Sequence, residues 1–228
     1  MTGTATAWSA LAQASPPGFL AQHGGEIATL TLEHLWLTGA AMLLAAAIGI
    51  PLGILLTRYT RWAKPVIGLA NILQTIPSLA MFGFLLPLPW LGERAARIAI
   101  AALTGYALLP ILRNTYAGIQ GLEPSVIEVA KALGMTGGQR LWKVELPLSA
   151  GFILAGVRTA TVTCVGVATI AAAVGAGGLG EFIFRGVASV DNRLVLAGAL
   201  PAAGLALAAD GFLGLIERRL RRRTSGQA

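Results

Sequence analysis

Long apolar runs with few or no charges alternate with short polar stretches along the whole chain. Crossing a bilayer as a helix takes about 20 apolar residues, and the runs that are long enough cover residues 35–56, 65–91, 98–119, 148–174 and 194–216. Each run must be helical, because hydrocarbon offers backbone groups no other hydrogen-bond partner. The pattern therefore predicts an all-α, polytopic membrane helix bundle with about five transmembrane helices.

Composition supports the same class. The 228 residues are 55% hydrophobic and 12% charged, with a mean hydropathy of +0.72, whereas a soluble domain carries roughly a quarter charged residues. The net charge of +7 does not indicate nucleic-acid binding, because the basic residues flank apolar runs and form no face interleaved with aromatics. Cys164 is the single cysteine, which excludes a disulfide or a cysteine-based metal site within one chain.

The distribution of Lys and Arg predicts the orientation. With the N-terminus outside, eleven of them lie at the inner ends of the runs and four at the outer ends, with Arg113 and Arg158 left inside the membrane. Cytoplasmic loops carry the basic excess, so the N-terminus is expected outside and the C-terminus inside. The chain then divides into an external segment (1–33), a transmembrane domain (34–217) and a basic cytoplasmic tail (218–228).

A polar, helix-forming stretch at residues 124–147 separates the third and fourth runs, on the predicted cytoplasmic side. Ser125 and Glu128 have the spacing of a capping box, in which each side chain bonds the other residue's backbone amide. Gly134 can supply the left-handed conformation that ends a helix. A first short helix is therefore expected before Gly134.

Thr136 and Gln139 repeat the capping-box spacing and predict a second short helix. Pro147 either ends that helix or lies in the first turn of the next span, where a missing amide costs nothing. The stretch 124–147 is thus expected to form a stiff bend of two helices along the membrane surface, called the elbow below. Local patterning alone leaves an ordinary amphipathic connector as an alternative.

The elbow carries a recognisable motif. E-V-A-K-A-L-G at 128–134, followed by V-E-L-P at 144–147, resembles the E-A-A-x3-G-x9-I-x-L-P signature of permease subunits of binding-protein-dependent ABC importers. Val129 and Val144 replace the Ala and Ile of that signature. In those permeases the motif is the coupling helix that fits a cleft on the ATPase subunit. The resemblance implies the same ATPase-coupling role here for the matching positions Glu128, Ala130, Gly134, Val144, Leu146 and Pro147.

Longer stretches between residues 30 and 220 look like the osmoprotectant branch of these permeases. They are I-P-L-G-I-L-L-T at 50–57, Q-T-I-P-S at 74–78, Y-A-L-L-P-I-L-R-N-T-Y at 106–116, and G-A-G-G-L-G at 175–180 with I-F-R-G at 183–186. The resemblance implies a type I ABC importer permease fold in the bacterial cytoplasmic (inner) membrane, forming the path for glycine betaine, choline or carnitine-type solutes. It also implies cytoplasmic ATPase subunits, an extracytoplasmic binding protein, and a second permease copy or a sister permease.

The chain is not expected to be an enzyme. It contains no G-x-x-x-x-G-K-[ST] loop, so ATP hydrolysis is assigned to the separate ATPase partner. His23 and His34 have too few companions for a metal site, and no cofactor is expected. G-A-G-G-L-G at 175–180 matches the dinucleotide pattern only formally, because that motif requires a preceding strand. An outer turn or close helix packing explains it better.

Two other functions remain open. A permease of the same type for methionine, a sulfonate or another amino-acid-like compound would share the elbow. A membrane transporter outside the ABC class is less favoured, since secondary transporters usually show repeated halves with paired broken helices and this chain shows no such repeat.

Polar residues inside the spans supply the remaining candidates. Arg113, Arg158 and Asp210 each need a partner in hydrocarbon, and we expect an interhelical ion pair of Asp210 with Arg158 or Arg113 that fixes packing. Candidates for lining a translocation path are Gln74, Thr75, Ser78 and Asn114. Hydrogen bonding to neighbouring helices is an equal alternative for these four.

Overall fold

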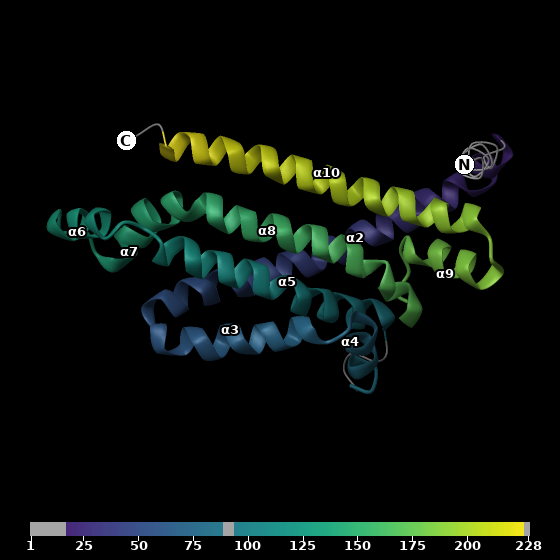
Figure 1. The fold of residues 1–228 in the computed structure, drawn as a ribbon, viewed down its shortest axis with the longest axis horizontal. Coiled ribbons are helices and arrows are strands. Elements are labelled where there is room, and N and C mark those ends of the chain that lie inside the picture. The colour runs from purple at the N-terminus through teal and green to yellow at the C-terminus, as the bar shows by residue number, and fades with distance from the viewer. Residues whose placement is uncertain (1–16, 89–93, 226–228) are drawn as a thin grey trace, which may run out of the picture.

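The structure is a computed structural model that describes residues 17–88 and 94–225, and every regular element in those ranges is a helix (Figure 1). The first half of the chain forms α2 (Pro17–Arg58), α3 (Thr60–Thr75), α4 (Ser78–Leu85) and α5 (Ala95–Gln120). The elbow region forms α6 (Pro124–Ala132), α7 (Gly137–Arg140) and the π-helical turn η1 (Leu141–Glu145). The remainder forms α8 (Leu146–Ala168), the 3₁₀ turn η2 (Ile170–Val174), α9 (Gly180–Ser189) and α10 (Asn192–Ser225).

Four helical stretches in the described residues are long and apolar enough to cross a membrane, or up to five if one bent pair of helices is counted as a single span. The four are Gln22–Arg58, Ala95–Gln120, Gly137–Ala168 and Asn192–Leu220. This confirms the all-α, multi-span prediction.

The second span differs from the prediction of one run at 65–91. It is a broken pair, in which α3 and α4 meet at 100°. Ile76 is extended, with φ −67° and ψ 127°, because a residue before proline is pushed out of the helical region. Pro87 comes after the end of α4, and Pro89 lies outside the described residues.

The first helix is longer than the apolar pattern indicated. Residues 1–16 lie outside the described residues, but α2 begins at Pro17 and runs past residue 33 without a break. At the other end, α10 continues beyond residue 217 to Ser225. Neither predicted boundary of the transmembrane domain therefore coincides with the end of a helix.

Three helices, α2, α5 and α8, form the centre of the bundle; α10 packs on α8 and α9, and α3 packs on α5 (Figure 1). Small residues let the central helices approach closely. A Cβ on Gly53 of α2 would lie 2.7 Å from Cβ of Thr115, and a Cβ on Gly156 of α8 would lie 2.7 Å from Cβ of Asn114. Close approach at small residues is how membrane helices gain packing energy without a hydrophobic driving force.

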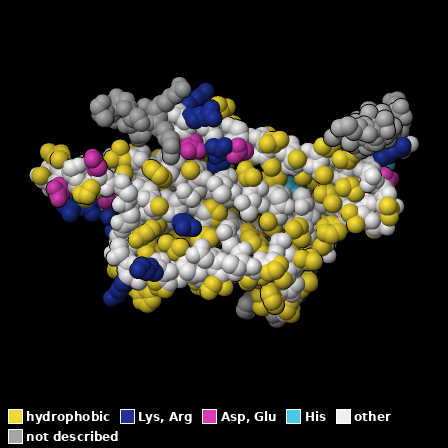
Figure 2. Space-filling view, in the orientation of Figure 1, with side chains coloured by type: hydrophobic (Ala, Val, Ile, Leu, Met, Phe, Trp, Pro, Cys, Tyr) yellow, Lys and Arg dark blue, Asp and Glu magenta, His cyan; other side chains and the backbone are white. Residues whose placement is uncertain are grey.

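Apolar and basic side chains gather on different parts of the surface. Figure 2 shows hydrophobic side chains over the flanks of the bundle, while Lys and Arg side chains gather mainly toward the end that carries α6 and α7. Large apolar side chains on these flanks are exposed, among them Leu43 of α2 and Leu207 of α10. An exposed apolar flank of this extent is typical of a surface that faces lipid or another subunit.

Candidate functional site: the elbow and the groove beside α3

The first elbow helix begins differently from the prediction. α6 starts at Pro124 with Glu123 as its N-cap, and no side chain caps it. The predicted capping box of Ser125 and Glu128 is therefore wrong: Ser125 already lies inside the first turn, where its hydroxyl donates to Oε2 of Glu123 at 3.4 Å. Pro124 sets the start because its fixed φ suits the first helical position.

The bend itself matches the prediction. Gly134 has a φ of +74°, the left-handed conformation, and the amide of Met135 donates to the carbonyl of Ala130 across it at 3.2 Å. The capping box at the next helix is confirmed, since the amide of Gln139 donates to Oγ1 of Thr136 at 3.3 Å and the amide of Thr136 donates to Oε1 of Gln139 at 3.0 Å. The elbow thus has a fixed geometry.

The second elbow helix does not stop at Pro147. It passes through η1 into α8 as one continuous stretch, with Pro147 in the first turn of α8. The amide of Leu146 donates to the carbonyl of Leu141, five residues back, as a π-helical turn requires. Pro147 therefore does not end the elbow helix but lies in the first turn of the next span. Any movement of this part of the elbow therefore acts directly on α8.

Residues of the importer motif divide into buried and exposed sets. Ala130 is buried, Val144 and Leu146 are half-buried, and Glu128 and Pro147 are exposed. Exposed apolar side chains accompany them, namely Val129, Leu133 and Trp142. An elbow with a buried inner side and apolar groups on its outer side can pack on the bundle and still offer a contact surface.

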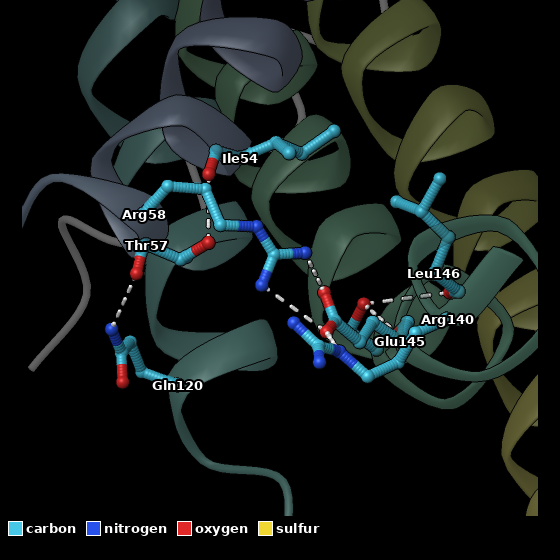
Figure 3. A network of polar contacts seen from close by, with 8 residues as sticks. Ile54, Thr57, Arg58, Gln120, Arg140, Glu145 and Leu146 are labelled. Atoms are coloured by element: carbon cyan, nitrogen blue, oxygen red, sulfur yellow. Dashed lines mark hydrogen bonds and ion pairs between the residues drawn. The ribbon is translucent and has the colours of Figure 1, made fainter. Parts of the chain in front are cut away.

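Glu145 is a functional candidate that the sequence reasoning missed. Its carboxylate is 2% exposed and binds two arginines from different segments (Figure 3). Oε1 accepts from Nε of Arg140 at 2.7 Å and from Nη1 of Arg58 at 3.2 Å, and Oε2 accepts from Nη2 of Arg58. A carboxylate directly before the Leu-Pro that opens an apolar run was the available signal.

Three of the predicted path residues share one cavity. A space of about 490 Å³ at the break between α3 and α4 is lined by Gln74, Thr75 and Ser78. Thr159 and Thr163 of α8 also line it and were not predicted, because a threonine in an apolar run gives no signal without the neighbouring helix. Asn114 lies elsewhere: its amide donates to the carbonyl of Pro110 at 2.8 Å.

A second cavity of about 690 Å³ lies between α3 and α5, toward the elbow end, and includes Lys64, Asn71 and Arg113 among its lining residues. On α3, the residues that line the two cavities recur every three to four positions, at 64, 67, 71 and 74. On α5 they recur at 106, 110, 113 and 117. This spacing puts each set on one helix face, so the cavities follow one another along a single groove, called the α3–α5 groove below.

Tyr106 holds the break in α3 against α5. Its hydroxyl donates to the carbonyl of Ile76, and its own backbone carbonyl accepts from Nε2 of Gln74 at 2.9 Å. Because Ile76 is extended at the break before Pro77, its carbonyl has no helical donor. The Tyr106 hydroxyl supplies that donor, which fixes the bend and with it the shape of the groove.

Residues 49–222 match the family model described as binding-protein-dependent transport system inner membrane component. The chain belongs to this family. It is accordingly a multi-pass inner-membrane permease subunit of an ABC importer, and family membership implies partnership with an ATPase and a substrate-binding protein.

Curated relatives of this permease cover nearly its whole length. It is 43% identical over 202 residues to the choline transport system permease protein OpuBB of Bacillus subtilis, covering 89% of this chain and 92% of that protein. The glycine betaine/carnitine/choline transport system permease protein OpuCB of the same organism matches to the same extent. The osmoprotectant import permease protein OsmW of Salmonella typhimurium is 43% identical over 197 residues, covering 86% and 92%.

Solved structures share the fold. A chain of the MetNI methionine ABC transporter in an inward-facing conformation aligns with a TM-score of 0.73 at 23% identity, covering 83% of this permease and 93% of that chain. A chain of an amino acid ABC transporter aligns with a TM-score of 0.66 at 19% identity, covering 88% and 96%. These matches confirm the type I ABC importer permease fold.

The permease also contains the ion pair expected inside the spans. Nε and Nη2 of Arg158 in α8 donate to the two carboxylate oxygens of Asp210 in α10 at 2.6 and 2.7 Å, and Nη1 donates to Glu217 at 3.3 Å. Of the two arginines considered as partners, Arg158 is the one in contact, while Arg113 faces the α3–α5 groove. This ion pair joins α10 to α8.

The glycine-rich turn at 175–180 follows a 3₁₀ helix, not a strand. Gly175, Gly177 and Gly178 have positive φ, and the amide of Gly178 donates to Oε2 of Glu33 in α2 at 3.1 Å. A side chain on Gly177 would place its Cβ 2.5 Å from that same carboxylate oxygen. The turn is therefore a packing element that fastens the start of α9 to α2.

Proposed function

We propose that this permease imports glycine betaine, choline, carnitine or related osmoprotectants delivered by an extracytoplasmic binding protein, with energy from a separate cytoplasmic ATPase. The observation that supports the solute class most directly is the 43% identity, over nearly the whole chain, to permeases named for those solutes. The α3–α5 groove is compatible with it. The cavity beside the break is lined by hydroxyls, an amide and apolar groups and has no carboxylate, so a quaternary ammonium would pass without a strong fixed charge to hold it.

The elbow is the proposed contact with the ATPase. The elbow offers an apolar surface at the polar end of the bundle, made by the exposed side chains of Val129, Leu133 and Trp142. Glu128 and Lys131 beside them supply charges that would orient a bound partner. A cleft on the ATPase that receives this surface would move the elbow and α8 together. Glu128, Ala130, Gly134, Val144, Leu146 and Pro147 form the proposed coupling set.

Orientation follows from the same assignment. We infer that residues 1–33 begin outside the cell, that the transmembrane domain is 34–217, and that the basic tail 218–228 ends in the cytoplasm, because the basic excess flanks the elbow end. The groove is flanked by α3, α5 and α8 of one subunit. A second copy or a sister permease is proposed to face it and complete the path.

Reconstituted transport tests the proposal. The permease is purified with its ATPase and binding protein, placed in liposomes, and assayed for uptake of labelled glycine betaine, choline and carnitine, with labelled methionine as the competing solute. Uptake of a quaternary ammonium that requires ATP and the binding protein is expected. ATP-dependent uptake of methionine instead would move the permease to another solute class, and uptake without the ATPase would reject the importer assignment.

A matched pair of variants tests the groove. Thr163 lines the α3–α5 groove, whereas Thr161, on the same helix, lines a separate apolar cavity between α2, α8 and α10. Both hydroxyls donate to carbonyls of their own helix at 3.0 and 2.8 Å, so replacement by valine perturbs the helix similarly. Thr163→Val is expected to lower uptake more than Thr161→Val. Equal effects would contradict the placement of the path.

A further inference from the structure

We propose that Glu145 is a positioning residue for energy coupling: by binding Arg58 and Arg140 together, it passes displacement of the elbow to α2 as well as to α8. The inference rests on the proposed docking of the elbow on an ATPase. It assigns a role to a carboxylate that the importer motif leaves unspecified, since Glu145 occupies the variable position between Val144 and Leu146.

The π-helical turn makes the contact within the elbow possible. In an α-helix, residues five apart point about 140° away from each other, because each residue turns the helix by about 100°. The wider turn over Leu141–Glu145 brings the fifth residue back to the same side. Nε of Arg140 consequently reaches Oε1 of Glu145 at 2.7 Å. The carboxylate of Glu145, the last residue of η1, is therefore bonded to Arg140, the residue directly before η1.

Arg58 connects the elbow directly to a third helix. It is the last residue of α2, and the elbow lies 87 residues further along the chain at Glu145. The elbow is continuous with α8 through η1 and follows α5 through a short turn, so both of those helices are joined to it by the backbone. The side-chain link from Arg58 adds α2, the third helix of the central bundle.

Burial makes the contact of Glu145 with Arg58 and Arg140 rigid enough to transmit movement of the elbow. Glu145 is 2% exposed, and its two partners are 35% and 18% exposed. Separating the carboxylate from its arginines would leave a charge buried without compensation, which is strongly unfavourable. The three side chains are therefore expected to stay together as the elbow moves.

A further hydrogen bond joins the end of α2 to the end of α5: the carbonyl of Thr57 accepts from Nε2 of Gln120 at 3.4 Å.

The experiment compares coupling ratios in the complete reconstituted importer. Glu145→Gln and Arg58→Gln are measured beside a control, Arg61→Gln. Arg61 lies in the first turn of α3, and its guanidinium lies over Trp62, away from Glu145. Assembly is checked by co-purification of the ATPase. ATP hydrolysis stimulated by the loaded binding protein and solute uptake are then measured on the same vesicles. The expected result is retained hydrolysis with uptake per ATP lowered about tenfold, the scale usual for coupling between sites, in the first two variants only.

A cross-link distinguishes force transfer from simple stabilisation. In a Cys164→Ser background, the double variant Arg58→Cys with Glu145→Cys is cross-linked by a reducible bis-methanethiosulfonate reagent. Uptake per ATP should recover on cross-linking and fall again on reduction.

Two outcomes would overturn the inference while leaving the proposed function intact: an unchanged ratio of uptake to hydrolysis in Glu145→Gln, or equal loss of hydrolysis, uptake and assembled complex with no recovery on cross-linking. Absence of any ATP-dependent uptake by the unmodified importer would instead reject the proposed function itself.

Discussion

Arg158 in α8 and Asp210 in α10 face each other with two parallel hydrogen bonds of 2.6 and 2.7 Å. Such a fork-to-carboxylate arrangement fixes relative orientation as well as distance. Gly214, one turn after Asp210, leaves room for it: a Cβ there would lie 3.1 Å from Cζ of Arg158. The guanidinium therefore packs against Gly214 of α10, and two glycine positions on this helix make the contact testable.

Gly214→Ala and Gly211→Ala form a matched pair. Both glycines lie in α10, but a Cβ on Gly211 would meet nothing within 4 Å. Alanine in a helix interior is more stable than glycine by about 0.5–1 kcal/mol, so Gly211→Ala should raise the melting temperature of the detergent-purified protein. Gly214→Ala should gain less or lose stability, because it displaces Arg158. Equal gains would show that the guanidinium is not held against α10.

Removing one partner of the Arg158–Asp210 ion pair should lower the stability of the protein more than removing both charges. Arg158→Met leaves Asp210 without its main partner in the membrane, whereas Arg158→Met with Asp210→Asn leaves no unpaired carboxylate at that position. Thermal unfolding of the two variants in the same detergent is the measurement. We expect the double variant to be closer to the unmodified protein. If the double variant is the less stable, the pair is not the interaction that holds α10.

Gly134 should tolerate asparagine and reject valine. Its φ is +74° and a Cβ would meet nothing within 4 Å, so the cost of a side chain is one of backbone conformation alone. That cost is about 1–2 kcal/mol for an L-residue and less for asparagine. Gly134→Val is expected to reach the membrane and to hydrolyse ATP in the complex without matching uptake, with Gly134→Asn close to normal. Gly137→Ala, at a neighbouring glycine without positive φ, is the control.

Close approach of α2 and α5 predicts opposite effects at two glycines of α2. A Cβ on Gly53 would lie 2.7 Å from Cβ of Thr115, whereas one on Gly39 would meet nothing within 4 Å. Gly53→Ala should destabilise by about 1–3 kcal/mol, the usual cost of overpacking. Gly39→Ala should be neutral or stabilising. Melting temperatures in detergent decide between them, and a stabilised Gly53→Ala would show that the helices lie further apart than the structure has them.

The orientation predicts one-sided labelling of the elbow. In a Cys164→Ser background, a cysteine at the exposed position of Gly138 should react with a membrane-impermeant maleimide in inverted vesicles and not in intact cells. A cysteine at Ser189, exposed at the end of α9, should give the reverse pattern. Labelling of position 138 in intact cells would refute both the orientation and the proposed docking of an ATPase.

Much of this permease was determined by local sequence. Apolar runs of sufficient length dictate spanning helices because hydrocarbon satisfies no backbone group. Gly134 and the Thr136–Gln139 box specify a bend because each acts within one helical turn. The capping prediction at Ser125 failed for an equally local reason, since Pro124 starts the helix and moves the N-cap two residues back, to Glu123. The single run expected at 65–91 is instead broken between α3 and α4, since Pro77 keeps the residue before it extended, and the angle of 100° is set by packing.

Contacts between distant segments were decided only in three dimensions. The sequence limited Asp210 to two possible arginines, and the packing of α10 on α8 selected Arg158. Thr159 and Thr163 became groove residues, and Asn114 did not, because the rotation of each helix about its axis is set by its neighbours. Glu145 was inconspicuous until the π-helical turn and the end of α2 brought two arginines to it. Apolar length and turn residues are local properties of a chain, whereas helix rotation and charge partners depend on how whole helices pack, which no single segment encodes.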